Sequence, residues 1–290
     1  MKCTVVGLRN SVGLARSVSK LLHARFLELK TTSFPDGELH IQYPKPTLTG
    51  HVILVQSFHP NPTTALVETL FAGKTAQELG AKKITLVAPY LAYLRQDKRF
   101  RPGDCVSNHL LAELLNFFDH VLTIDPHLHR IVSLSEIFKT NAQHITANTL
   151  LAEFIEKKYP DSFLIGPDSE SSQWAARIAQ HIHHPFVILK KKRYTASSVR
   201  TKVQTPTSVH GKTVILVDDI ISTGHTMLEP IKQLKNLGAR RIVCICVHGV
   251  FAENALKLLQ KAGATVIATN TISNPVARIN VAPLIAQALQ

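Results

Sequence analysis

Short runs of Val, Ile and Leu recur along this chain and alternate with segments of helical periodicity. Each run is almost wholly apolar, which is typical of a strand covered on both faces of a sheet. The predicted strands are Thr4–Val6, Val52–Gln56, Ile84–Ala88, Val121–Ile124, Phe163–Ile165, Phe186–Leu189, Val214–Val217, Ile242–Val247 and Thr265–Ala268. Predicted helices begin at Asn61-Pro62, with Gly80 at the end, and cover Ser107–Asn116, Ala147–Tyr159, Ser171–Ile182, Met227–Leu237 and Asn254–Ala262.

Alternating strands and helices predict parallel sheets with helices on both faces. Both halves of the chain show the pattern, so we predict an α/β protein of two similar domains. The domains are expected at residues 1–142 and 143–290, with the boundary near Thr140–Ala147. The last segment, Ser273–Gln290, can return to pack on the first domain.

The composition is that of a chain able to bury a substantial core, with 290 residues of which 45% are hydrophobic. Its 4 cysteines show no CxxC pair and no zinc-ligand spacing, so a reducing, cytoplasmic environment is expected. The N-terminus lacks the apolar core of a signal peptide, and no apolar window approaches about 18 residues. We therefore expect neither secretion nor contact with a membrane.

Lys and Arg outnumber Asp and Glu by 33 to 20, which gives a net charge of +13 and predicts an anionic partner. Nucleic acid and small phosphates both satisfy that requirement. The basic residues are scattered apart from one run, Lys190–Arg193, and aromatic residues make up only 6% of the chain. This distribution favours small phosphates over nucleic acid.

A candidate phosphate-binding loop follows the predicted strand Val214–Val217. Its residues are Asp218 and Asp219, then two isoleucines, then the segment Ser222–Thr226, STGHT. Loops at the carboxyl ends of parallel strands bind ligands, and the N–H groups at a helix N-terminus hold phosphate. Thr226 has capping-box spacing to Glu229, which also places the following Pro230 in the first helical turn. An ordinary turn with a solvated Asp pair is the alternative.

The segment VDDIISTGHT resembles the phosphoribosyl-diphosphate motif of type I phosphoribosyltransferases and ribose-phosphate pyrophosphokinases. The resemblance implies type I phosphoribosyltransferase-like domains, with the Asp pair facing ribose hydroxyls and the loop binding the 5-phosphate. The residues so implied to bind ribose 5-phosphate are Asp218, Asp219, Ser222, Thr223, Gly224, His225 and Thr226. The family usually has glycine where this chain has His225, and glycine tolerates positive φ more readily.

Two elements upstream resemble ribose-phosphate pyrophosphokinases specifically. Ser33–Glu38 reads SFPDGE and Pro89–Arg99 reads PYLAYLRQDKR. Without the family, the first is a simple turn and the second a solvated charged loop. The resemblance implies that Phe34 stacks on adenine while Asp36 and Glu38 hold its polar edge. The ATP-binding residues are then Phe34, Asp36, Glu38, Arg95 and Gln96.

Three further segments resemble the same family. In Asp125–Arg130, DPHLHR, the resemblance implies that His127 contacts Mg²⁺–ATP, although a single histidine after a strand is also compatible with a structural role. In Gly166–Trp174, GPDSESSQW, the resemblance implies that Asp168 binds the metal. The sequence of this loop, together with that of Asp125–Arg130, is closer to archaeal-type members of the family. In the basic run, it implies that Lys191 and Arg193 are catalytic and close over the reacting phosphates, where a solvated or nucleic-acid patch is the alternative.

These motifs predict a ribose-phosphate pyrophosphokinase. Such an enzyme uses Mg²⁺ to transfer the pyrophosphoryl group of ATP to the C1 hydroxyl of ribose 5-phosphate. The resemblance covers nearly the whole chain and also implies a homo-oligomer. A phosphoribosyltransferase, a non-catalytic regulatory subunit of the pyrophosphokinase type and a basic nucleic-acid-binding module remain the alternatives.

Overall fold

The computed structural model describes residues 3–128, 130–167, 172–188, 190–193, 199–202 and 209–290; in 172–174, 187–188, 190–193 and 199–202 it describes the backbone only. The chain divides into two compact units. Unit 1 comprises Met1–Thr146, Thr271–Ser273 and Val281–Gln290, and unit 2 comprises Ala147–Asn270 and Asn274–Asn280. No helix in the described ranges has the length and apolar character needed to cross a bilayer.

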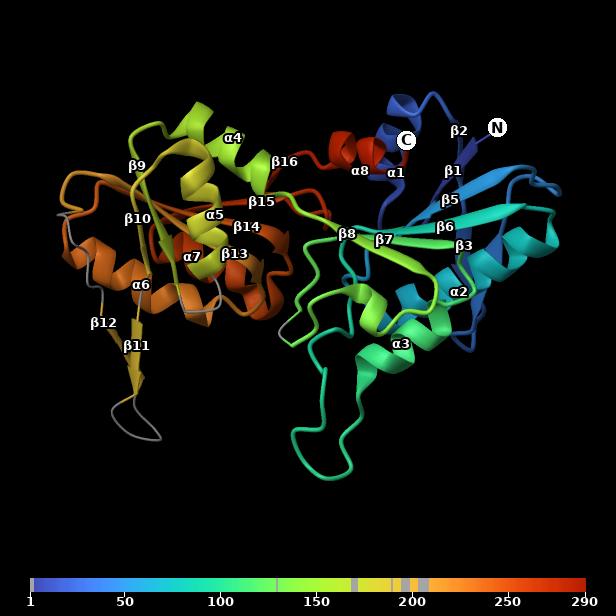
Figure 1. Ribbon diagram of the computed structural model, residues 1–290, viewed down its shortest axis with the longest axis horizontal. Helices are drawn as coiled ribbons and strands as arrows, with labels where there is room; N and C mark the ends of the chain where they lie inside the picture. The colour runs from blue at the N-terminus through green and yellow to red at the C-terminus, as the bar shows by residue number, and fades with distance from the viewer. Residues whose placement is uncertain (1–2, 129, 168–171, 189, 194–198, 203–208) are drawn as a thin grey trace. The chain divides into compact units, whose positions relative to one another are not determined.

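Unit 1 is built on six parallel strands in the order β2-β1-β5-β6-β7-β8 (Figure 1). The strands are β1 (Cys3–Gly7), β2 (Arg25–Glu28), β5 (His51–Val55), β6 (Lys83–Ala88), β7 (His120–Ile124) and β8 (Asn141–Ile145). The central strands are buried along nearly their whole length. The edge strands β2 and β8 instead carry mostly exposed or half-buried side chains.

Helices cover both faces of this sheet (Figure 1). Helices α1 (Val12–Leu21) and α8 (Ala282–Ala288) pack together on one face, and α2 (Pro62–Glu78) and α3 (Ser107–Leu115) cover the other. Helix α2 begins as predicted, because the Asn61 side chain accepts a hydrogen bond of 3.1 Å from the Thr64 N–H and Pro62 follows it. Gly80, at φ 100°, ends it.

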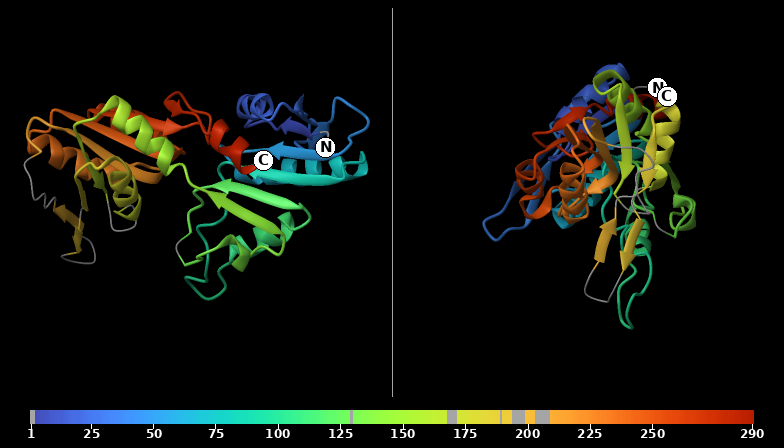
Figure 2. Two further views of the ribbon diagram at one scale, coloured as in Figure 1. Left: turned by 45° about the horizontal axis from the view of Figure 1, so that its top comes forward. Right: turned by 90° about the vertical axis from the view of Figure 1, so that its left-hand side faces the viewer.

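Unit 2 also has six parallel strands, in the order β10-β9-β13-β14-β15-β16. The strands are β9 (Ser162–Gly166), β10 (Phe186–Ile188), β13 (Thr213–Ile221), β14 (Arg241–Gly249), β15 (Ala264–Thr269) and β16 (Ala277–Ile279). The helices are α4 (Asn148–Lys158), α5 (Ser172–Ile182), α6 (His225–Asn236) and α7 (Ala255–Lys261). The views in Figure 2 show helices on both sides of each sheet, which confirms the predicted fold class.

The two units share one topology. In each, the chain first forms two neighbouring parallel strands and then a two-stranded antiparallel hairpin. The next strand pairs with the free edge of the first strand: β5 with β1 in unit 1, and β13 with β9 in unit 2. The hairpin is β3 (Lys30–Ser33) with β4 (Leu39–Gln42) in unit 1, and β11 (Lys190–Arg193) with β12 (Val199–Lys202) in unit 2. The loop after β5 therefore occupies the same position in its unit as the loop after β13.

Candidate active site

The Asp pair of unit 2 lies in a strand, not in the loop. Strand β13 is four residues longer than the predicted Val214–Val217 at its carboxyl end, because it stays paired with β14 as far as Ile221 opposite Gly249. Asp218 and Asp219 are half-buried there. The Asp219 N–H donates to Asp218 Oδ1 at 3.1 Å, and the Ile220 N–H donates to Asp219 Oδ1 at 2.8 Å. Both carboxyl groups are thus fixed by backbone where a ligand would meet the sheet.

Gly224 is the residue that turns the loop into α6. It caps the helix at φ 75°, a left-handed torsion that favours glycine. A Cβ added there would lie 3.3 Å from Ala255 Cβ and 3.4 Å from Leu259 Cγ, both on α7. The first N–H groups of an α-helix have no helical carbonyl one turn before them, so those at the start of α6 can hold a phosphate. The Met227 N–H is an exception, because it donates to the Gly224 carbonyl at 3.0 Å. Ser222 and Thr223 are half-buried beside them, whereas His225 and Thr226 are exposed.

Two expectations for this helix are wrong. No side chain caps α6, so Thr226 and Glu229 do not form a capping box; Glu229 instead accepts a hydrogen bond of 2.9 Å from Gln233 Nε2. Pro230 lies in the second turn, because the helix begins at His225. The same early start gives His225 a right-handed helical torsion, so the histidine causes no strain where the family usually has glycine.

The two thiols of β14, the strand next to the Asp pair, are not nucleophiles. Cys244 and Cys246 on β14 are fully buried. Burial, with a smaller contribution from the charge of Asp218, raises the pKa of Cys244 to about 12. Burial also raises the pKa of Cys246 well above its usual range. Both thiols therefore stay protonated at neutral pH and contribute packing.

The loop that follows β14 supports the phosphate loop, and the sequence analysis missed it. The N–H groups of Val250 and Phe251 donate to the Ile221 carbonyl at 3.1 and 3.0 Å. Phe251, Glu253 and Asn254 have positive φ values of 48°, 53° and 61°. Left-handed torsions at residues other than glycine often gather near functional sites. The available sequence signal was the position of this loop, at the end of the strand next to β13.

The predicted adenine-binding residues of unit 1 form the tip of the β3–β4 hairpin. The Phe34 side chain is 51% exposed, and its ring meets His40 edge-on with centroids 5.5 Å apart. The Phe34 N–H donates to the Glu38 carbonyl at 2.8 Å, and the Glu38 N–H donates to Asp36 Oδ1 at 3.1 Å. The tip is thus an ordered turn that presents an aromatic ring and two exposed carboxyl groups.

An ion pair joins two other predicted ligand loops of unit 1. Arg130 Nη1 donates to both carboxyl oxygens of Asp97, at 2.8 and 3.1 Å. The Asp97 side chain is only 2% exposed, and that of Arg130 is 52% exposed. This pair links the loop of Arg95 and Gln96 to the loop that carries His127, which is half-buried. The structure therefore brings these predicted residues to neighbouring loops.

The hairpin tip does not join that group within one chain. Its hairpin follows β2, whereas Asp125 and His127 follow β7, four positions away in the sheet. At about 4.8 Å per strand, these two strands are roughly 19 Å apart. Among the described residues, no hydrogen bond connects Phe34, Asp36 or Glu38 with Arg95 or Gln96.

The remaining predicted residues lie in or near the parts of unit 2 that the structure leaves out. Asp168 lies outside the described residues. Lys191 and Arg193 are on β11, where their backbone pairs with Thr201 and Val199 of β12. The basic run is thus one strand of a hairpin.

The described residues contain no group of three or more His, Cys, Asp or Glu side chains that could hold a metal ion. Mg²⁺ does not require such a group, because it keeps several waters and is commonly held by one or two carboxylates and by substrate phosphates. Mg²⁺ prefers oxygen ligands, so a role for the His127 nitrogen rests on the family resemblance and not on the chemistry of the residues described.

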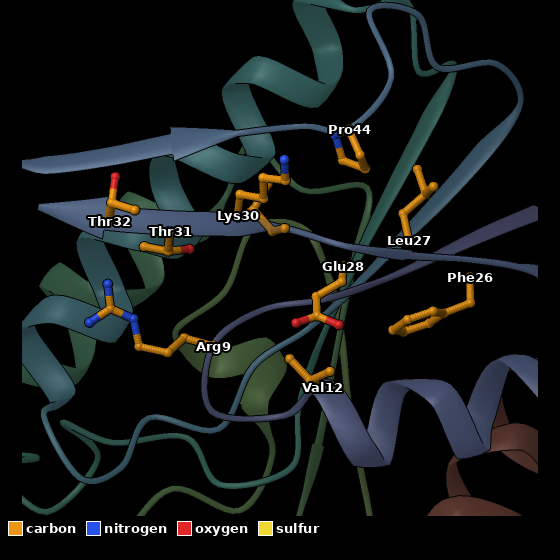
Figure 3. A pocket seen from close by; sticks show the side chains of 10 residues that line it. Arg9, Val12, Phe26, Leu27, Glu28, Lys30, Thr31, Thr32 and Pro44 are labelled. Atoms are coloured by element: carbon orange, nitrogen blue, oxygen red, sulfur yellow. The ribbon is translucent and has the colours of Figure 1, made fainter.

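A pocket of about 710 Å³ opens in unit 1 at the base of the β3–β4 hairpin (Figure 3). It is lined by Arg9, Val12, Phe26, Leu27, Glu28, Leu29, Lys30, Thr31, Thr32 and Pro44. No predicted site residue lines it. It combines Arg9 and Lys30 with the acidic Glu28, which itself accepts a hydrogen bond of 3.5 Å from Arg16.

Known proteins match both halves of the chain. Residues 3–118 match the family model for the N-terminal domain of ribose phosphate pyrophosphokinase, and residues 133–284 match the phosphoribosyl transferase domain. The ribose-phosphate pyrophosphokinase of Methanothermobacter thermautotrophicus is 35% identical over 289 residues, covering 99% of both chains. That of Methanopyrus kandleri is 33% identical over 290 residues, covering 99% of this chain and 98% of the relative. Both relatives are archaeal, as the resemblance predicted.

A solved structure agrees. The phosphoribosylpyrophosphate synthetase from Mycobacterium smegmatis superposes with a TM-score of 0.85 at 29% identity, covering 99% of this chain and 98% of its own. The fold and the loop after β13 define a protein of the phosphoribosyltransferase class. Its N-terminal half is the part that distinguishes it within that class. The chain belongs to the ribose-phosphate pyrophosphokinase family.

Proposed function

We propose that this chain transfers the pyrophosphoryl group of ATP to the C1 hydroxyl of ribose 5-phosphate, giving 5-phosphoribosyl diphosphate and AMP. The match of residues 3–118 to the N-terminal domain of ribose phosphate pyrophosphokinase is the observation that carries the proposal. A phosphoribosyltransferase needs no such domain. The full-length match to pyrophosphokinases supports the same choice.

Ribose 5-phosphate is assigned to unit 2. The carboxyl groups of Asp218 and Asp219 accept hydrogen bonds from the ribose hydroxyls. The 5-phosphate binds at Ser222–Thr226, where hydroxyl groups and the N–H groups at the start of α6 are available. The support for this assignment is that Asp carboxyls and helix N-terminus lie at the same end of β13.

ATP is assigned to residues of unit 1. Arg95 and Gln96 contact its phosphates, and His127 lies on the loop that Arg130 ties to them. Phe34 stacks on the adenine, with Asp36 and Glu38 at its polar edge. We also propose a homo-oligomer, because the hairpin tip and the Arg95 loop lie far apart within one chain. A hairpin from a second copy of the chain would complete the ATP site.

The reaction needs no nucleophile from the protein. The C1 hydroxyl oxygen of the sugar forms a bond to the β-phosphorus of ATP, and the bond from that phosphorus to the α,β-bridging oxygen breaks, so AMP leaves with the electron pair. The hydroxyl proton passes to solvent, and no general base is assigned. Lys191, Arg193 and Arg95 neutralise the charge on the transferring phosphates, while Asp218 and Asp219 hold the sugar in line.

Mg²⁺ is the proposed cofactor. His127 and Asp168, together with the ATP phosphates, are the groups that would hold it. When bound, it neutralises phosphate charge and polarises the phosphorus that is attacked.

Product analysis tests the function. Purified protein with ATP, Mg²⁺ and ribose 5-phosphate should form AMP and a pyrophosphorylated sugar in equal amounts. Formation of ADP together with a ribose bisphosphate, which carries one added phosphoryl group, would identify an ordinary kinase. No turnover, with ATP and sugar phosphate still bound, would favour a regulatory subunit.

A further inference from the structure

A buried carboxyl group joins three separate segments of unit 1. Glu68 lies on α2 and is 1% exposed. Its Oε1 accepts a hydrogen bond of 2.6 Å from Thr31 Oγ1 and one of 3.4 Å from the Arg9 N–H, and its Oε2 accepts one of 2.7 Å from Gln56 Nε2. The donors come from β3, from the loop after β1 and from the first residue after β5. Because a buried carboxyl group is costly unless it is satisfied, this arrangement is specified by the fold.

The hydrogen bonds continue into the two loops. Gln56, fully buried, accepts from the Asn10 N–H at 3.1 Å through its Oε1. The Ser57 N–H donates to Ser11 Oγ at 2.8 Å, and both residues are buried. The loops after β1 and β5 are therefore fixed to each other and to Glu68 by a polar network with little exposure to water.

The position of this network is informative because the two units share one topology. The loop after β5 corresponds to the loop after β13, which is the proposed phosphate loop Ser222–Thr226. Glu68 itself lies in the second turn of α2, the helix that follows this loop, and it holds the start of the loop through Gln56. The network therefore fixes the part of unit 1 that corresponds to the proposed ligand-binding end of unit 2.

Thr31 connects the network to the hairpin. It lies in β3, where it pairs with Ile41 of β4, and it is three residues before Phe34. Figure 3 shows Thr31 on that strand with Arg9 nearby. A two-stranded hairpin is marginally stable by itself, so its orientation depends on such attachments. On the β4 side, Tyr43 donates from its hydroxyl to the Ala72 carbonyl at 2.8 Å.

We propose that Glu68 is a positioning residue for the ATP site: through Thr31 it fixes the β3–β4 hairpin so that the tip of Phe34, Asp36 and Glu38 is held ready for the adenine. The link to adenine rests on the proposed function, whereas the fixing of the hairpin does not. Glu68 touches neither substrate, so its effect is confined to the hairpin and the segments it joins.

The test removes only the hydroxyl that reaches Glu68. Thr31→Val keeps the β-branched shape and deletes that hydrogen bond, and Thr31→Ser retains it. Thr85→Val is the control, because Thr85 is a buried threonine of β6 whose Oγ1 shares a hydrogen bond of 2.8 Å with His51 Nε2, away from the hairpin but in the same unit. Backbone hydrogen exchange of residues 30–42 and the KM for each substrate are measured in all three variants and in wild type.

We expect Thr31→Val to speed hydrogen exchange of the hairpin amides and to raise the KM for ATP, each by roughly five- to tenfold. The KM for ribose 5-phosphate and the kcat should stay within about twofold of wild type, since the deleted bond acts through the adenine-binding tip. Thr31→Ser should restore the wild-type values. Glu68→Gln, if it folds, should resemble Thr31→Val.

The proposal is overturned if Thr31→Val and Thr85→Val show the same hairpin exchange, or if the hairpin loosens and the KM for ATP does not rise. Wild-type protein that makes no AMP would refute the proposed function. The exchange comparison would then still decide whether Glu68 fixes the hairpin.

Discussion

Arg130→Ala should destabilise unit 1 more than the removal of any exposed ion pair, because it leaves the Asp97 carboxyl group buried without its partner. Asp97 is 2% exposed and accepts from Arg130 Nη1 at 2.8 and 3.1 Å. Breaking a fully buried ion pair costs roughly 3–5 kcal/mol, and leaving a single buried polar group unsatisfied costs roughly 1–3 kcal/mol. Since the Arg130 side chain is 52% exposed, water screens the pair and we expect the lower range, about 2 kcal/mol.

Urea denaturation followed by circular dichroism measures this loss. Glu28→Gln is the control: it removes the charge opposite Arg16 in a pair whose side chains are 53% and 55% exposed, and it should cost less than about 0.5 kcal/mol. Because the Asp97 pair also links the Arg95 loop to the His127 loop, Arg130→Ala should raise the KM for ATP and leave that for ribose 5-phosphate unchanged. Equal urea midpoints for Arg130→Ala and Glu28→Gln would refute the reasoning.

Three further perturbations have defined outcomes. Gly224→Ala should lower the free energy of unfolding by roughly 1–2 kcal/mol, because alanine is strained in the left-handed torsion, and should raise the KM for ribose 5-phosphate. Gly211→Ala is the control: Gly211 has φ 71° and open space around it, so the variant should lose similar stability with an unchanged KM. Burial and the neighbouring Lys83 lower the pKa of His120, so the contribution of neutral His120 to stability is present above the ordinary histidine pKa and is lost as the pH falls below it. The decrease in urea midpoint from pH 8 to pH 5 should therefore be smaller in His120→Gln than in wild type, and an equal decrease would contradict this. Lys191→Ala should reduce kcat far more than it changes either KM, and a loss confined to KM would remove Lys191 from the catalytic role.

The apolar runs predicted the fold well because most strands here are covered on both faces. Such strands leave a continuous hydrophobic signal, as in β5 and β13. The edge strands β2 and β8 were missed, since their side chains are largely exposed and their sequences, RFLE and NAQHI, contain no apolar run. Their place in the sheet is set by pairing with β1 and β7, which no local pattern records.

The motifs predicted which segments meet ligands but not how those segments are held. The helical torsion of His225 follows from the start of α6 at that residue, directly after Gly224 at φ 75°. The Asp97–Arg130 pair joins residues that are 33 positions apart, and the bond from Thr31 to Glu68 spans 37. These contacts are products of the tertiary fold, so a single sequence gives no direct sign of them.

The central claim is that a pyrophosphoryl group, and not a single phosphoryl group, leaves ATP. The most direct measurement follows ATP labelled at the β-phosphorus in the presence of Mg²⁺ and ribose 5-phosphate. The account predicts that the label moves to the sugar and that the AMP formed carries none. Label retained in ADP, or released as free phosphate while the sugar stays unlabelled, would contradict it.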